Sequence, residues 1–97
     1  MFLLNAVTAI TTGSTVTLGQ ARGGSRMIAQ AGSTDPADTF TIVLEGRLST
    51  NMGWATLATL TNAAPIAAEI PSVPLMRARV TAYTRPGSGT LSCEVQE

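Results

Sequence analysis

Histidine and lysine are both absent from the 97-residue sequence, and Cys93 is the only cysteine. General acid–base catalysis near neutral pH usually draws on histidine, or on a lysine or carboxylate with a displaced pKa. The six aspartates and glutamates are scattered over different predicted turns and strands, and no nucleophile and base occur at a recognisable spacing. The chain is therefore predicted not to be an enzyme.

The same shortages bear on metal and cofactor sites. A single cysteine excludes an intrachain disulfide, and a zinc site built from cysteine and histidine lacks its ligands. The Asp-Pro-Ala-Asp segment at 35–38 offers two carboxylates to calcium, but Asp-Pro is a common turn opener, so a turn is favoured. The glycines at 23–24 and 87–89 are not followed by the Lys-Ser/Thr of a phosphate loop. No metal and no cofactor is expected.

Charge is also scarce: charged residues make up 12% of the chain, apolar residues 44%, and the formal net charge is zero. No long-range field attracts nucleic acid or an anionic membrane, so neither is an expected partner. The apolar opening at residues 2–4 ends at Asn5, which is too short for a secretory signal or a membrane span, and synthesis in a cytoplasm is the default expectation. A weakly charged surface suits burial against a partner protein.

Threonine is the commonest residue, and many threonines alternate with aliphatic residues, the period-two pattern of half-buried strands. Residues 40–48 predict the clearest strand, with one face formed by Phe40, Ile42, Leu44 and Leu48. Residues 75–84 predict a second, with Met76, Ala78, Val80 and Ala82 on one face and Arg77, Arg79, Thr81 and Tyr83 on the other.

Further strands are predicted at 54–61 and at 90–96, the latter forming a hairpin with 75–84 through the turn at 85–89. Weaker candidates lie at 7–12, 15–18, 26–31 and 66–70, and a short helix at 62–70 is the alternative for the last of these. Seven or eight short strands predict an all-β antiparallel sandwich or barrel, and a sandwich of jelly-roll type is favoured. Residues 7–97 form one domain, and residues 1–6 form either an edge strand or an N-terminal arm.

Two single residues have competing interpretations. Cys93 alternates with Leu91 and Val95, which predicts a buried thiol rather than a nucleophile. Trp54 follows a glycine turn and is predicted to pack in the core; a sugar-binding platform would instead need it exposed.

Two groups of residues are candidates for a partner interface. An arginine and tyrosine stripe on the strand at 75–84 is either a solvated face or an interface anchor, because both residue types are enriched at protein contacts. The apolar opening would dock on another protein if it does not enter the core. The six candidate interface residues are Phe2, Leu3, Leu4, Arg77, Arg79 and Tyr83.

The segment 40–60 resembles a pattern found in small bacteriophage structural proteins. There, a strand ending in Leu-Glu-Gly-Ser-Leu is followed by a polar Gly/Asn turn, a tryptophan and an alternating Thr/Leu strand. A Met/Leu-Arg-x-Arg-Val-Thr-Ala strand often follows, as at 75–82 here, and a Gly-x-Gly turn then leads to a terminal strand, as at 87–97. This chain departs from the pattern in having Arg47 where a small polar residue is usual, and Met52, which lengthens the turn.

The resemblance implies a capsid decoration (cement) protein that binds the assembled phage head and stabilises the shell. The implied partners are the major capsid protein and further copies of this chain in a symmetric array, and the implied location is the capsid surface of the virion. A neck or tail component and a carbohydrate-binding module are the alternatives.

Overall fold

The computed structural model describes residues 2–17, 26–62, 67–71 and 73–96, which form eight β-strands. The strands are β1 (Phe2–Val7), β2 (Val16–Thr17), β3 (Arg26–Ser33), β4 (Thr39–Arg47), β5 (Ala55–Thr61), β6 (Ala67–Pro71), β7 (Leu75–Thr84) and β8 (Leu91–Gln96). The described residues include no helix, and hence none that is long and apolar enough to cross a membrane.

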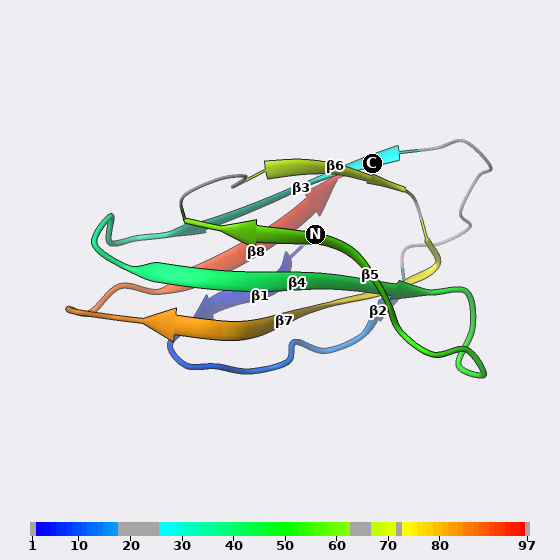
Figure 1. Ribbon diagram of the computed structural model, residues 1–97, viewed down its shortest axis with the longest axis horizontal. Helices are drawn as coiled ribbons and strands as arrows, with labels where there is room; N and C mark the ends of the chain where they lie inside the picture. The colour runs from blue at the N-terminus through cyan, green and yellow to red at the C-terminus, as the bar shows by residue number, and fades with distance from the viewer. Residues whose placement is uncertain (1, 18–25, 63–66, 72, 97) are drawn as a thin grey trace.

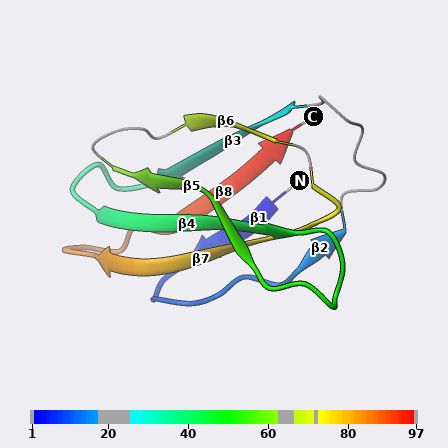
Figure 2. The same cartoon turned by 45° about the vertical axis from the view of Figure 1, so that its right-hand side comes forward.

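The strands form two four-stranded antiparallel sheets stacked face to face (Figures 1 and 2). Sheet A has the order β1-β8-β3-β6 and sheet B the order β2-β7-β4-β5. Strand 1 therefore pairs with 8, 2 with 7, 3 with 6 and 4 with 5. Such nested pairing is that of a long hairpin rolled up on itself, so the predicted all-β sandwich of jelly-roll type is confirmed.

The core lies between the inner faces of the two sheets, because alternate side chains of each strand point inward. Sheet B contributes Ile42 and Leu44 from β4 and Met76 from β7, all at 0% exposure. Burying such a side chain stabilises the fold by about 1.5–3 kcal/mol. Leu48, predicted on the same face as Ile42, is 69% exposed because β4 ends at Arg47 and the alternation stops there.

A β-bulge changes which residues of β7 face the core. The register between β4 and β7 shifts between Thr41 and Ile42, so that Thr81 is the extra residue on β7. Beyond the bulge the alternation reverses: Ala82, predicted to be inward, is exposed, and Tyr83, predicted to be outward, packs against the core beside Phe40. The predicted faces of β7 are therefore correct up to Thr81 and wrong at Ala82 and Tyr83.

The predicted C-terminal hairpin is wrong, although both of its strands exist. β7 pairs with β4 and β2 in sheet B, whereas β8 pairs with β1 and β3 in sheet A. Residues 85–90 thus carry the chain from one sheet to the other, as Figure 1 shows at the orange end of the sandwich. A glycine-rich turn signals that the chain reverses direction, but it does not specify the strand that pairs with the next segment.

The N-terminal segment is an edge strand rather than a loose arm. β1 pairs with β8 and buries Leu3 and Leu4, whereas the strand predicted at 7–12 is absent. Residues 11–13 instead contact β7 through two backbone hydrogen bonds, from the Val80 amide to the Thr11 carbonyl and from the Gly13 amide to the Ala78 carbonyl, each 2.8 Å long. Pairing with a distant strand overrides the weak local pattern here.

The helix considered at 62–70 is replaced by a strand over the part that the structure describes. Ala67–Pro71 pairs with β3, and Ile70 is fully buried in the core. Residues 63–66 lie outside the described residues. The alanines favour a helix locally, but cross-strand pairing and burial of Ile70 outweigh that preference.

Candidate binding face around Trp54

The outer face of sheet B carries a cluster of charged and aromatic side chains, here called the arginine–tryptophan patch. It comprises Arg47, Trp54, Arg77, Arg79 and Glu45. Arg47 is the last residue of β4, and Trp54 immediately precedes β5. The two other arginines are two residues apart on β7, which places them on the same face of the sheet.

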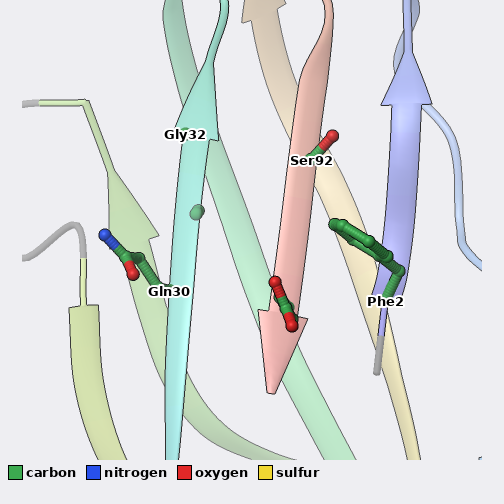
Figure 3. A pocket seen from close by; sticks show the side chains of 6 residues that line it. Phe2, Gln30, Gly32 and Ser92 are labelled. Atoms are coloured by element: carbon green, nitrogen blue, oxygen red, sulfur yellow. The ribbon is translucent and has the colours of Figure 1, made fainter. Parts of the chain in front are cut away.

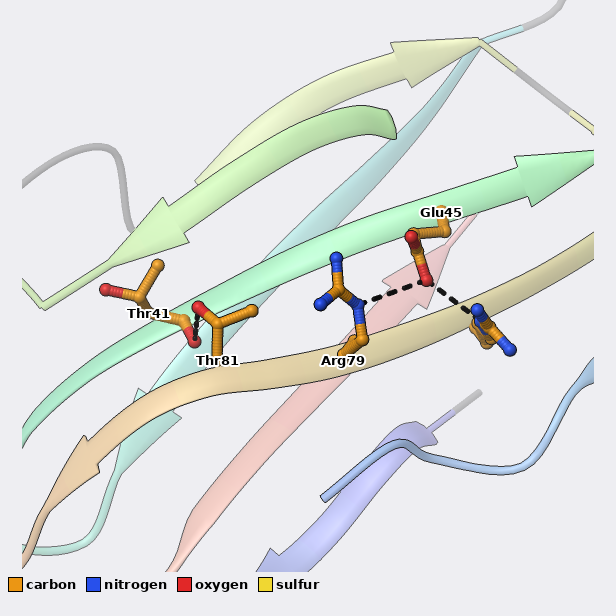
Figure 4. Close-up of polar contacts among 5 residues, drawn as sticks. Thr41, Glu45, Arg79 and Thr81 are labelled. Carbon is orange, nitrogen blue, oxygen red and sulfur yellow. Dashed lines mark hydrogen bonds and ion pairs between the residues drawn. The ribbon is translucent and has the colours of Figure 1, made fainter. Parts of the chain in front are cut away.

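Strand register brings Glu45 into the centre of the patch. Glu45 on β4 lies opposite Arg77 on β7. The Arg77 Nε donates to Glu45 Oε1 over 2.9 Å, and the Arg79 Nε lies 3.5 Å from the same oxygen (Figure 4). The Glu45 side chain is only 9% exposed, against 27% for Arg77 and 43% for Arg79. A carboxylate this enclosed needs opposite charge beside it, and two guanidinium groups supply it.

Trp54 is held by two of the arginines. The guanidinium carbons of Arg47 and Arg77 lie 4.2 and 4.3 Å from the centroid of the indole ring. Cation–π contacts at this distance contribute about 0.5–2 kcal/mol each, depending on how far water is excluded. The prediction that Trp54 packs in the core is wrong, since the residue lies before β5 on the outer face and is half-buried there among arginines.

The patch carries an excess of positive charge. Its three arginines face one carboxylate, that of Glu45, which is the ion-pair partner of Arg77 and Arg79. No carboxylate among the described residues lies within ion-pair distance of Arg47, and the Arg47 Nε is buried without a hydrogen-bond acceptor. Nearly all buried polar groups in proteins have such an acceptor. Hydrogen-bonding capacity in the patch is therefore not used up within the chain.

Tyr83 does not belong to this patch, although its spacing from Arg77 and Arg79 predicts a shared face. Its hydroxyl donates to Asp38 Oδ2 over 2.9 Å, and the Ser33 hydroxyl donates to the same oxygen over 2.5 Å. Burial and the hydrogen bond to Asp38 raise the pKa of Tyr83. A Cβ at Gly89 would overlap the Asp38 carboxylate, so only glycine allows the turn after β7 to approach this closely. The group joins two turns at one end of the sandwich.

The apolar opening is divided between the core and the surface. Leu3 and Leu4 are 5% and 3% exposed and belong to the core, so they can reach a partner only if β1 detaches. Phe2 is 50% exposed on the outer face of sheet A. It borders an open hollow of about 190 Å³ above Gly32, which Gln30, Ser92 and Glu94 also line (Figure 3).

The other candidate sites have structural roles. At 35–38, Asp35 Oδ1 accepts a hydrogen bond from the Ala37 amide over 2.9 Å, so the favoured turn is confirmed. Among the described residues, no three cysteines, aspartates or glutamates gather to hold a metal. Cys93 is fully buried as predicted, and burial raises the pKa of its thiol to about 12. A thiol with such a pKa is protonated at neutral pH and is a poor nucleophile.

No protein-family model, no curated protein and no solved structure matches this chain.

Three members of the patch are missing from the residues singled out in the sequence as interface candidates, namely Arg47, Trp54 and Glu45. Arg77 and Arg79 were found because spacing along one strand is visible in a sequence. Glu45 becomes their partner only through the β4–β7 register, and Trp54 reaches them only because the β4–β5 turn returns beside β4. An isolated tryptophan after Met-Gly, seven residues after Arg47 and nine after Glu45, carries no recognisable signal for this arrangement.

Proposed function

We propose that this chain is a non-enzymatic decoration protein of a bacteriophage head, and that it binds the assembled shell through the arginine–tryptophan patch. The observation that carries the binding role is the contact of Trp54 with two arginines on an outer sheet face. Tryptophan and arginine are the residues most enriched at energetic hot spots of protein interfaces. Their positions are set by Glu45 and by the sheet, so little side-chain freedom is lost on binding.

The phage assignment rests on the resemblance of segments 40–60 and 75–82 to phage structural proteins. The patch draws Glu45, Arg47 and Trp54 from the first segment and Arg77 and Arg79 from the second. Binding to assembled capsomers and not to free subunits stabilises the shell by mass action. Many copies, arranged with the symmetry of the shell and in contact with the major capsid protein, are expected on the virion surface.

Two alternatives remain for the same fold. A neck or tail component would use the same patch but occur in few copies per particle. A carbohydrate-binding module would stack a sugar on an open aromatic face; the Trp54 ring is instead in contact with two guanidinium groups and the Tyr83 hydroxyl is bonded to Asp38, which argues against that role.

The placement on the head is tested by quantitative mass spectrometry of purified particles, comparing copies of this chain with copies of the major capsid protein. A ratio near one, or a simple fraction of it, supports decoration of the shell. A handful of copies per particle places the protein in the neck or tail, and absence from the particle overturns the proposal.

The role of the patch is tested by adding purified protein to heads stripped of it. Trp54→Ala is expected to weaken binding by at least about tenfold, as truncation of a hot-spot tryptophan does. Ile28→Ala, an exposed apolar residue on the opposite sheet at 62% exposure, is the control and is expected to bind as the parent chain does. Equal binding of both variants would exclude the patch as the contact surface.

A further inference from the structure

We infer that the arginine–tryptophan patch is a binding site for carboxylate groups, so that its partner presents an acidic protein segment to Arg47, Arg77 and Arg79. The identity of that partner as a capsid rests on the proposed function. The chemistry of the site does not, since it follows from the charges, contacts and burial of residues within this chain.

The balance of charge in the patch favours an anion. The patch holds three guanidinium groups, each with five N–H donors, and one carboxylate, that of Glu45, which contacts Arg77 and Arg79 through one oxygen. Arg47 has no carboxylate within ion-pair distance among the described residues. Its Nε lacks an acceptor but is buried, so this atom is not itself a donor to a ligand. An added carboxylate would compensate the excess charge of the three arginines.

The geometry of the patch favours planar recognition. A guanidinium group carries its N–H donors in its own plane, which suits bidentate hydrogen bonding to a carboxylate. Arg47 and Arg77 are both in contact with Trp54. Glu45 holds Arg77 and approaches Arg79, and Figure 4 shows Glu45 beside Arg79. The donors are thus positioned before a ligand arrives, which lowers the entropic cost of binding.

The composition of the patch favours a carboxylate over a nucleic-acid phosphate. Nucleic-acid surfaces have extended basic tracks that neutralise several successive phosphates. Here the excess is two charges within one small area, the chain has no lysine, and its formal net charge is zero. The Glu45 carboxylate in the same area also repels a phosphodiester chain with charge spread along it. A single acidic side chain or a short acidic segment is the better complement.

Trp54 provides the measurement, because it is the only tryptophan and lies inside the site. The full chain is titrated with a capped hexaglutamate peptide while the tryptophan emission is recorded, at low and at physiological ionic strength. We expect a saturable change with hexaglutamate that weakens as salt is added. A hexaglutamine peptide of the same length is expected to give none.

Matched variants separate the patch from general charge effects. Arg79→Gln, at a side chain 43% exposed, is expected to weaken hexaglutamate binding by about tenfold, as the loss of one charge-assisted hydrogen-bond donor does. Arg85→Gln makes the same change of charge outside the patch and is expected to alter binding less than about twofold. Urea unfolding of both variants checks that each is folded.

Each outcome decides one claim. No response to hexaglutamate, an equal response to hexaglutamine, or equal effects of the two arginine variants overturns the carboxylate site. Tighter binding of hexathymidylate than of hexaglutamate overturns it in favour of a nucleic-acid site. Binding of hexaglutamate by a protein that does not bind phage heads leaves the site standing and overturns only the proposed function.

Discussion

Asp38 and Glu45 lie near opposite ends of β4 and are the two buried carboxylates among the described residues, at 2% and 7% exposure. Glu45 faces two arginines on the outer side of sheet B. Asp38 faces hydroxyl groups instead: those of Ser33 and Tyr83 donate to its Oδ2, and its Oδ1 has no hydrogen-bond partner. The two ends of β4 thus enclose two carboxylates in different ways.

The difference separates a binding role from a structural one. Ser33 belongs to β3 of sheet A and Tyr83 to β7 of sheet B, so Asp38 ties the two sheets together at the end of the sandwich. The two hydroxyls are uncharged and the Asp38 carboxylate is 2% exposed, so this group presents no charge to a partner. Glu45 instead holds arginines that remain partly exposed, so the charge it organises stays available at the surface.

The largest effect on stability is expected from Asp38→Ala. The change removes the acceptor of the Ser33 hydroxyl and the nearer of the two acceptors of the Tyr83 hydroxyl, which is expected to lower the free energy of unfolding by about 3 kcal/mol. Urea unfolding of the variant and the parent chain measures the loss. A loss no greater than that of Glu45→Ala would show that the hydroxyl-bonded carboxylate is not the more structural of the two.

Cys93 can be compared with the two buried carboxylates, because its thiol is also buried but is neutral at neutral pH. Its thiol has a pKa of about 12 in the folded chain and about 9 when unfolded, so above pH 9 the unfolded chain loses a proton that the folded chain keeps. Stability is therefore complete below pH 9 and falls as the pH rises toward 12. At pH 10 the loss is expected to be about 1.4 kcal/mol.

The thiol is isolated by comparing the parent chain with Cys93→Ala in urea at pH 8 and pH 10. The pKa of Tyr83 is also raised, so this residue contributes to the pH dependence as well. Both chains contain Tyr83, and its contribution therefore cancels in the difference between them. The parent chain is expected to lose more stability over this interval than the variant. An identical loss in the two chains contradicts the assignment.

Tyr83→Phe removes one of the two donors to Asp38 and keeps the aromatic packing. It is expected to cost about 1 kcal/mol, less than Asp38→Ala, because the Ser33 hydroxyl still donates to the carboxylate. Thermal or urea unfolding measures the change. If Tyr83→Phe lowered the free energy of unfolding as much as Asp38→Ala does, the Tyr83 hydroxyl alone would account for the stabilisation by Asp38.

The smallest effect is expected from Glu45→Gln, about 0.5 kcal/mol of unfolding free energy. Both arginines are partly exposed, so water replaces most of the lost attraction, and the amide oxygen still accepts from Arg77. Unfolding by urea at low and high salt provides the measurement. A loss above about 2 kcal/mol would mean that this carboxylate is part of the scaffold, as Asp38 is, and not an organiser of the surface.

Local patterns predicted much of the fold but little of the site. Alternation placed β4, β5, β7 and β8 near their observed positions and identified Ile42, Leu44 and Cys93 as core residues. It failed at Tyr83, because one extra residue in β7 inverts every later side chain. It also failed at Trp54, because the tendency of an indole ring to be buried does not distinguish a core from a layer of arginines.

The order of amino acids alone predicts the all-β class, most of the inward-facing residues and the buried thiol. Each of these follows from interactions between near neighbours or from the chemistry of one residue type. The jelly-roll pairing, the hydroxyl-bonded Asp38 and the union of Glu45 with Arg77 and Trp54 arise only in the folded chain. Each joins residues from separate strands or turns, and their register is set by the packing of both sheets together.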